Sequence, residues 1–428
     1  MKNLKFILPL LLVILVSSCK ETKEKEVTEE VTKEVAKVDP LADLPDWQYV
    51  GYKIVHHMTA QIKHVDEFGF NEFDHPPIAD YQSFVITPAL DHFYSKAVAD
   101  LRNGFVVVNT PARDDRYSSL EVFDMEHHAI FAEVTGPEVQ QYVIAHVDYK
   151  GELPEGKAVI RTNAMFPFVF IRTQSFEIAG DPKADELRRS ASIEGTAGEK
   201  DVIDIEDTRA IIKYVIDNNK SYPQTEALMA EAAKSYTPEV HKITFENVKA
   251  FLGSGGISGN VGMFEAVDDP AGGSHKVRAA GTLMGHLGFP VRHAYYQNIP
   301  VTPEGVIHAG ANGPFVITVP FAPGVDLFWS VTRYDFTTFL PLNPADIGGN
   351  NIQAYNAFNT KPDADGNVTF TYSMEDPNDA TYWMPVTEGE YYMIFRYYGP
   401  AASLNGNTAK DIVYKGTALE KKFETVQF

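Results

Sequence analysis

The sequence predicts a mainly β protein in which two β-domains are separated by helices. Its 428 residues, 44% of them hydrophobic, are enough for two or three domains with buried cores. Aromatic residues make up 12%, and 30 glycines and 26 prolines supply turns, a composition that favours strands and tight connections. Short β-like runs occur before and after a helical stretch. We therefore expect an N-terminal antiparallel β-sandwich, a helical connector and a C-terminal jelly-roll-like β-sandwich.

The first residues resemble a bacterial lipoprotein signal. Basic residues precede an apolar run, Phe6–Val16, which is too short to span a bilayer as a permanent helix. Residues 16–19 (VSSC) resemble a lipobox, which implies that residues 1–18 are a signal peptide and that Cys19 is lipidated. An ordinary secretory signal with a coincidental Cys is the alternative. The sequence thus predicts a location in the bacterial cell envelope, with the outer membrane as the expected site and the lipid as the only membrane contact.

A charged tether, residues 19–46, is expected before the folded body because it has no aromatic residue and cannot bury a core. The whole chain carries 58 acidic and 37 basic side chains, a net charge of −21 at pH 7. This charge argues against nucleic acid as a partner, since such binders need clustered Lys and Arg. The single Cys excludes a disulfide framework and a zinc site of several thiolates. Any metal would be held by His and carboxylates.

Residues 47–195 are expected to form the first sandwich, because short β-like runs alternate there with turn residues. The chain then changes character over 196–290, where apolar residues of 204–219 follow helical spacing and Ser274 can cap a later helix that ends near Gly288. Strands return in 291–428. The β-like runs of the first region are Phe84–Thr87, Phe105–Asn109, Tyr117–Phe123, Gln141–His146, Ala158–Thr162 and Phe166–Arg172.

Five motifs of the C-terminal region, in this order, closely resemble the bacterial family called domain of unknown function 1214. They are FWSVTRYD (328–335), LNP (342–344), DADGNVTFTY (363–372), YWMPV (382–386) and FRYYGP (395–400). Three earlier segments, 87–95, 105–124 and 168–173, resemble its usual partner, domain of unknown function 1254. The resemblance covers most of residues 50–415. It implies an N-terminal sandwich and a C-terminal jelly roll with helices between them, and it implies no settled activity.

One segment departs from the pattern of that partner family, which resembles Pro-Asn-x-Asp-Thr-x-Tyr-Ser. Here Ala89 stands for Asn and His92 for Thr, whereas Asp91, Tyr94 and Ser95 remain. Any site on this motif would therefore have altered chemistry.

A candidate metal site follows the expected strand 117–123. Strand alternation would put Asp124, Glu126 and His128 on one face, and two carboxylates with an imidazole could hold one divalent metal ion with an open coordination position. The alternative is a polar strand end that is hydrogen-bonded to loops. Asp91 and His92 would add ligands, and Tyr94 a catalytic group, if their strand lies beside this one.

Further candidates are arginines and aromatic residues in apolar runs. Arg172 ends one such run and could orient a ligand carboxylate or phosphate, although a structural ion pair is the alternative. The C-terminal strands could hold a small molecule or glycan on exposed rings and cations, although Trp and Tyr more often fill cores. These C-terminal candidates are Trp329, Arg333, Trp383, Arg396 and Tyr398.

Two hypotheses follow. In the first, the chain is a metal-assisted hydrolase or lyase for a small polar molecule: Asp124 and His128 bind the metal, Glu126 is a ligand or general base, and Arg172 and Tyr94 act on substrate. In the second, it is a lipoprotein that binds a glycan or nutrient without catalysis. No serine in the sequence lies in a nucleophile-elbow motif. Metal content would separate the two hypotheses.

Overall fold

The computed structural model describes residues 41–83, 86–177, 180–254, 259–300, 302, 306–321, 325–379 and 381–400. The chain divides into two compact units, Met1–Ala42 and Asp43–Phe428, and only Leu41 and Ala42 of the first are described. The predicted signal peptide, Cys19 and most of the tether therefore lie outside the described residues. Within the described part, no helix is both long and apolar enough to cross a membrane.

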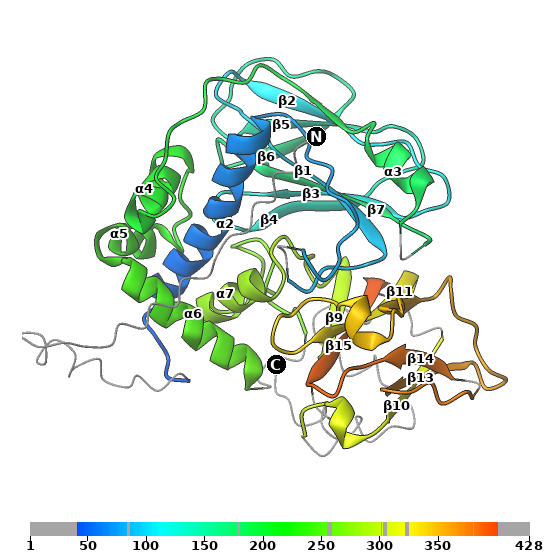
Figure 1. The fold of residues 1–428 in the computed structure, drawn as a ribbon. Coiled ribbons are helices and arrows are strands. Elements are labelled where there is room, and N and C mark those ends of the chain that lie inside the picture. Colours follow the sequence, from blue (N-terminus) through cyan, green and yellow to red (C-terminus); the bar gives the residue numbers. More distant parts are fainter. Residues whose placement is uncertain are drawn as a thin grey trace, which may run out of the picture. The chain divides into compact units, whose positions relative to one another are not determined.

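The N-terminal β-domain contains, among its described residues, eight strands in two four-stranded sheets (Figure 1). The first sheet is antiparallel throughout, whereas β5 and β6 of the second sheet are parallel. The first sheet consists, in spatial order, of β1 (His92–Val98), β7 (Phe168–Gln174), β3 (Ser118–Phe123) and β4 (Ala129–Val134). The second consists of β6 (Ala158–Thr162), β5 (Gln141–His146), β2 (Phe105–Asn109) and β8 (Ser192–Glu194).

Alternating side chains of these strands fill the space between the two sheets. Leu120, Val122 and Ile171 from the first sheet pack with Val106 and Ile144 from the second. The predicted sandwich is confirmed. Of the expected strand Phe84–Thr87, two residues lie outside the described part, and the other two are not in a strand.

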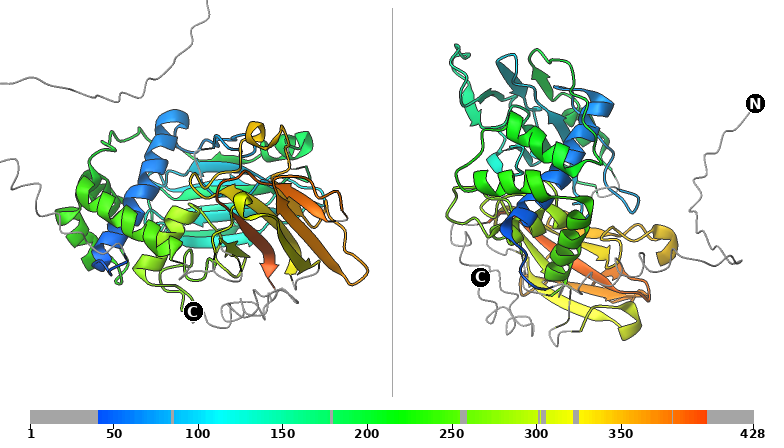
Figure 2. Two further views of the ribbon diagram at one scale, coloured as in Figure 1. Left: turned by 60° about the horizontal axis from the view of Figure 1, so that its bottom comes forward. Right: turned by 90° about the vertical axis from the view of Figure 1, so that its left-hand side faces the viewer.

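A layer of helices covers the other face of the first sheet (Figures 1 and 2). Its longest member, α2, was not predicted from the sequence, although its buried residues Val50, Ile54, Met58 and Ile62 follow i, i+4 spacing. The sequence analysis included this segment in the expected sandwich, residues 47–195, and assigned it no element of its own. The helices of this layer are α2 (Asp46–Phe68), α4 (Thr208–Asn218), α5 (Glu226–Ser235), α6 (Pro238–Gly253) and α7 (His275–Met284). The short helix α3 (Pro182–Arg188) lies apart from them and contacts β1 and β7.

Four helices, α4 to α7, all contact α2. Ser274 caps α7 as predicted, by accepting from the Val277 backbone N–H. The helix ends at Met284, before the expected Gly288, and the segment after it runs along the sheet face. This segment brings His286 and Leu287 to the candidate site.

The C-terminal β-domain also consists of two open sheets in its described residues, with no closed barrel. Trp329, Phe370, Met384 and Phe395 pack between them. One sheet has the order β12 (Ala354–Asn356), β11 (Val325–Asp335), β15 (Tyr391–Pro400) and β9 (Ala294–Ile299), and the other has β10 (Phe315–Pro320), β13 (Asn367–Ser373) and β14 (Tyr382–Pro385). Two short 3₁₀ helices, η1 (Gly310–Asn312) and η2 (Pro344–Ile347), lie in its connections.

The two β-domains meet through aromatic side chains. Tyr117 and Phe289 pack with Phe328 and Tyr398 in one buried cluster. Because Phe328 and Tyr398 point away from the core of their own sandwich, they join the sheet β12-β11-β15-β9 to the N-terminal domain. The expected fold class, two β-domains separated by helices, is confirmed.

Candidate functional site

The loop between β3 and β4, residues 124–128, is a tight turn built around one carboxylate. Asp124 Oδ1 accepts from the backbone N–H groups of Glu126 (2.9 Å) and His128 (2.8 Å), and His127 adopts a left-handed φ of 61°. The turn sends the Asp124 and His128 side chains to one side, where they bond each other, and the His127 ring to a different set of partners.

On the first side, buried polar groups form a hydrogen-bonded chain. Lys53 Nζ lies 2.8 Å from His128 Nε2, and His128 Nδ1 lies 3.0 Å from Asp124 Oδ2. The Tyr222 hydroxyl donates to the same carboxylate oxygen at 2.7 Å. Since a lysine ammonium can only donate, His128 accepts at Nε2 and donates from Nδ1. The Lys53 ammonium thus lies where a metal would have to bind His128, and the geometry favours proton transfer over the predicted metal site.

The pKa values of this chain are set by burial and mutual charge. Burial, then Arg278, lowers the pKa of Lys53 to about 7. Burial alone would raise the pKa of Asp124, but His128 and Tyr222 outweigh it and bring it to about 2. Burial and then the Asp124 charge raise the pKa of Glu126, which accepts a hydrogen bond from Asn219, to about 7. Such shifts are typical of functional sites, although structural networks also produce them.

On the other side of the loop, three histidines from distant parts of the chain converge. They are His57 of α2, His127 of the loop and His286 after α7, and one ring nitrogen of each lies within 4.8 Å of the others. His57 Nδ1 is 2.8 Å from His286 Nε2. The sequence analysis missed this triad, because separations of 70 and 159 residues leave no local spacing to recognise.

The surroundings of the triad orient its rings. His57 Nε2 lies 3.0 Å from the Asp124 carbonyl oxygen, and His127 Nδ1 lies 2.9 Å from the Thr282 hydroxyl. The Leu287 backbone N–H donates to His127 Nε2 at 3.2 Å. Burial lowers the pKa of His57 to about 3 and holds those of His127 and His286 well below the usual value, with neighbouring imidazoles adding to the effect at His127 and His286. The rings are therefore neutral at pH 7.

The motif residues of β1 lie elsewhere. His92 Nδ1 contacts Asp91 Oδ1 at 2.8 Å, and the His92 ring packs among Tyr117, Phe328 and Tyr398. The Tyr94 hydroxyl accepts from the Ala89 backbone N–H at 3.0 Å. Because β7 lies between β1 and β3, the condition under which Asp91, His92 and Tyr94 would join Asp124 is not met. These residues line the contact with the C-terminal domain instead.

Two of the three candidate arginines, Arg172 and Arg396, are buried and held by protein groups. Arg172 pairs with Glu121, donates to the Leu287 carbonyl oxygen at 2.5 Å and lies 3.8 Å over the Phe289 ring. Arg396 donates to the Thr87 carbonyl oxygen and the Tyr334 hydroxyl, each at 2.7 Å. The geometry favours the structural alternative over a ligand clamp. Leu287 connects Arg172 to the histidine triad, because its backbone N–H donates to His127 Nε2 and its carbonyl oxygen accepts from Arg172.

Two family models match the chain. One, described as a protein of unknown function (DUF1254), matches residues 70–194, and another, described likewise (DUF1214), matches residues 294–402. The chain pairs these two domains. The recognition from motifs is thereby confirmed, and the motif segments of the two domains meet where Arg396 of the DUF1214 domain bonds Thr87 and Tyr334 bonds the Pro88 carbonyl oxygen at 2.6 Å.

One solved structure supports the fold. The VPA0106 protein from Vibrio parahaemolyticus is 20% identical, with a TM-score of 0.63 over 84% of this chain and 95% of that chain. A putative uncharacterized protein from Burkholderia cenocepacia is 14% identical, with a TM-score of 0.46 over 87% and 90% of the two chains. No curated protein matches. The Vibrio protein shows the fold alone.

The aromatic candidates of the DUF1214 domain are mostly interior. Trp329 and Tyr398 are each 2% exposed, and the Trp329 indole donates to the Phe321 carbonyl oxygen. Trp383 lines a surface hollow of about 460 Å³ together with Asp346 and Glu388. Of the aromatic residues expected to form an exposed sugar-binding surface, only Trp383 lines a surface hollow. Arg333 is completely buried.

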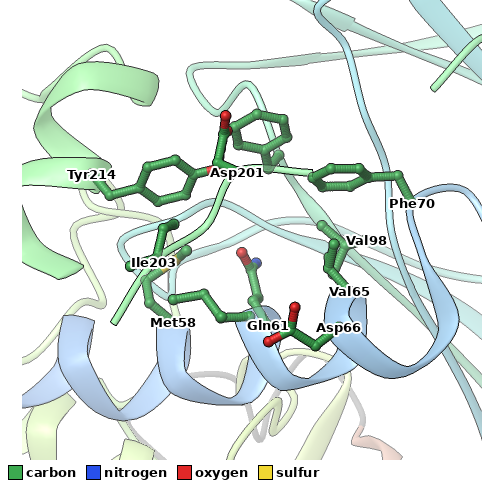
Figure 3. A pocket seen from close by; sticks show the side chains of 11 residues that line it. Met58, Gln61, Val65, Asp66, Phe70, Val98, Asp201, Ile203 and Tyr214 are labelled. Carbon is green, nitrogen blue, oxygen red and sulfur yellow. The ribbon is translucent and has the colours of Figure 1, made fainter. Parts of the chain in front are cut away.

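A small cavity lies beside the triad under α2. It holds about 20 Å³, room for about one water molecule, and Met58, Phe70 and Tyr214 contribute to its walls (Figure 3). Gln61 also lines it, and the Gln61 amide nitrogen lies 3.2 Å from His57 Nε2. Gln61 therefore links the cavity to the triad.

Proposed function

We propose that the protein is an enzyme of the bacterial cell envelope in which His57, His127 and His286 hold one divalent metal ion. The metal would activate water for hydrolysis, or a leaving group for elimination, on a small polar substrate. The observation that carries the proposal is the approach of three neutral imidazole nitrogens within 4.8 Å of one another. Three protein ligands and one open position are the usual arrangement of catalytic zinc sites.

The surroundings of the triad support this proposal. Metal-binding imidazoles generally donate their second N–H to a carbonyl, carboxylate or water, and His57 Nε2 faces the Asp124 carbonyl oxygen. Two nitrogens on a tetrahedral metal lie ~3.3 Å apart, so binding would lengthen the 2.8 Å contact between His57 and His286 and shorten any nitrogen pair that lies near the 4.8 Å limit. The His127 ring would have to exchange its Leu287 hydrogen bond for the metal or bind through Nδ1.

The hydrogen-bonded chain of Lys53, His128 and Asp124 would supply proton transfer beside the metal. Asp124 connects the two groups, since its carboxylate faces His128 and its carbonyl faces His57. Arg172 would act on the site only through Leu287. Lipidation at Cys19 would confine the enzyme to the envelope, and its partner would be a small-molecule substrate. The alternative, a glycan-binding lipoprotein, is less supported because Trp329 and Tyr398 are buried.

The test is a Co²⁺ titration of the full chain in detergent after metal removal. We expect visible absorption bands that saturate at about one equivalent. His286→Gln should lose the bands while keeping its far-ultraviolet dichroism. The matched control, His64→Gln, changes a histidine of α2 that packs on the same Phe168 ring as His286, and it should keep the bands.

A further variant separates this proposal from the metal site expected from sequence. Asp124→Asn with His128→Gln should retain Co²⁺ binding if the triad is the site. Absence of bands in the parent, or bands that persist in folded His286→Gln, would refute the proposal.

A further inference from the structure

Arg333 is a buried cation that has no carboxylate partner among the residues that the structure describes. Its side chain is 0% exposed. Nη2 donates to the Gln353 side-chain oxygen, whereas Nε and Nη1 have no hydrogen-bond partner within the described part of the chain. Among the described residues, no carboxylate forms an ion pair with this guanidinium. Arg172, by contrast, has Glu121.

The groups around Arg333 add a further donor. Tyr372 of the facing sheet is fully buried, and its hydroxyl also has no partner. Burial holds the pKa of Tyr372 well above 10, so the hydroxyl keeps its proton. Tyr391 stacks on Tyr372 at 5.9 Å between ring centroids, and both phenols interact electrostatically with Arg333. Burial lowers the pKa of Arg333 to about 9, which leaves it charged at pH 7.

Physical chemistry makes this arrangement costly unless an acceptor fills it. A buried guanidinium loses its hydration, and only an anion or several acceptors replace that loss. The cluster presents unpaired N–H and O–H donors and no unpaired carboxylate. We propose that Arg333 and Tyr372 bind a small oxyanion, a carboxylate or an inorganic oxyanion, inside the C-terminal sandwich.

A surface hollow of the same domain is lined by Trp383 and Val386, and by the acidic Asp346 and Glu388. Val386 belongs to the same buried cluster as Tyr372 and Tyr391. Arg333 and Tyr372 lie on β11 and β13 of the C-terminal domain, whereas the histidine triad comes from α2 and from the segments after β3 and α7. The oxyanion would therefore be a second ligand beside the proposed metal ion. A test of the oxyanion site does not depend on whether the triad binds a metal.

Thermal unfolding of the full chain tests the site. The buffer contains chloride alone, or acetate, phosphate or sulfate at matched ionic strength. We expect the unfolding temperature of the parent to rise by several degrees with at least one oxyanion, because only the folded state binds it. In chloride alone, Arg333→Met should unfold at a higher temperature than the parent, since it removes an uncompensated charge. The oxyanion shift should vanish in this variant.

Two further variants keep the test decisive. Tyr372→Phe removes one hydroxyl and should reduce the shift even if Arg333→Met does not fold. Arg292→Met changes an exposed arginine paired with Asp269 and should leave the shift unchanged. If no oxyanion stabilises the parent, if the shift persists in folded Arg333→Met, or if it is undiminished in Tyr372→Phe, the site is refuted.

Discussion

His293 allows a quantitative test of how burial couples the fold to pH. It lies where the two β-domains meet, its Nε2 atom is buried without a partner, and its ring packs on Phe289. Burial, then the positive charges of Arg292 and Arg172, lowers its pKa from 6.5 to about 4. The unfolded chain therefore binds a proton near pH 6.5, whereas the folded chain binds it only near pH 4.

The magnitude follows from the linkage of proton binding to folding. The contribution of neutral His293 is fully present above pH 6.5 and is lost as the pH falls to 4. At about 1.4 kcal/mol per pH unit, this amounts to about 3 kcal/mol. Replacing His293 by Gln should remove this dependence, so the variant should gain about 3 kcal/mol relative to the parent between pH 7.5 and pH 4.

Urea unfolding at several pH values measures this difference directly. A matched control, Phe289→Leu, loosens the same contact without removing a titrating group, so its stability loss should be the same at pH 7.5 and pH 4. Equal pH slopes for the parent and His293→Gln would refute the argument that burial holds this ring neutral.

Three further substitutions are expected to lower the free energy of unfolding. Arg172→Met leaves Glu121 buried without its partner and should lower the free energy of unfolding by about 3–5 kcal/mol; if urea unfolding shows less than 1 kcal/mol, the ion pair is not formed. Gly51→Ala would place a Cβ 2.5 Å from the Tyr236 ring and should cost about 1–3 kcal/mol by overpacking, measured as a lower melting temperature, whereas an unchanged value would contradict the contact of α2 with that ring. Asp207→Ala removes the carboxylate that accepts from two backbone N–H groups at the start of α4 and should cost about 1 kcal/mol; equal helicity and stability by circular dichroism would contradict the cap.

Strands could be predicted from local alternation more readily than the helix that organises the site. The bounds of Phe105–Asn109, Gln141–His146 and Ala158–Thr162 match the structure, because each run is apolar and ends at turn residues. A strand was expected around His92 without bounds, since polar residues such as His92 and Lys96 interrupt β1, and β4 and β8 were not predicted. Helix α2 was missed although its period is regular, and with it Lys53 and His57 were missed.

The sequence analysis singled out residues 124–128, which the structure places beside Lys53 and the histidine triad, but their chemistry depends on contacts that only the fold supplies. Nothing near Asp124 in the sequence indicates that Lys53 lies against His128. The same holds for His286, which reaches His57 because α7 packs on α2. The order β1-β7-β3 likewise separates Asp91 from Asp124, and strand order is not encoded in any single run.

The most direct test of the proposed metal enzyme is elemental analysis of the full chain, purified in detergent without chelator. We predict about one equivalent of a divalent metal in the parent and none in folded His286→Gln. Metal-free parent protein that also fails to take up Zn²⁺ or Co²⁺ would contradict the proposal.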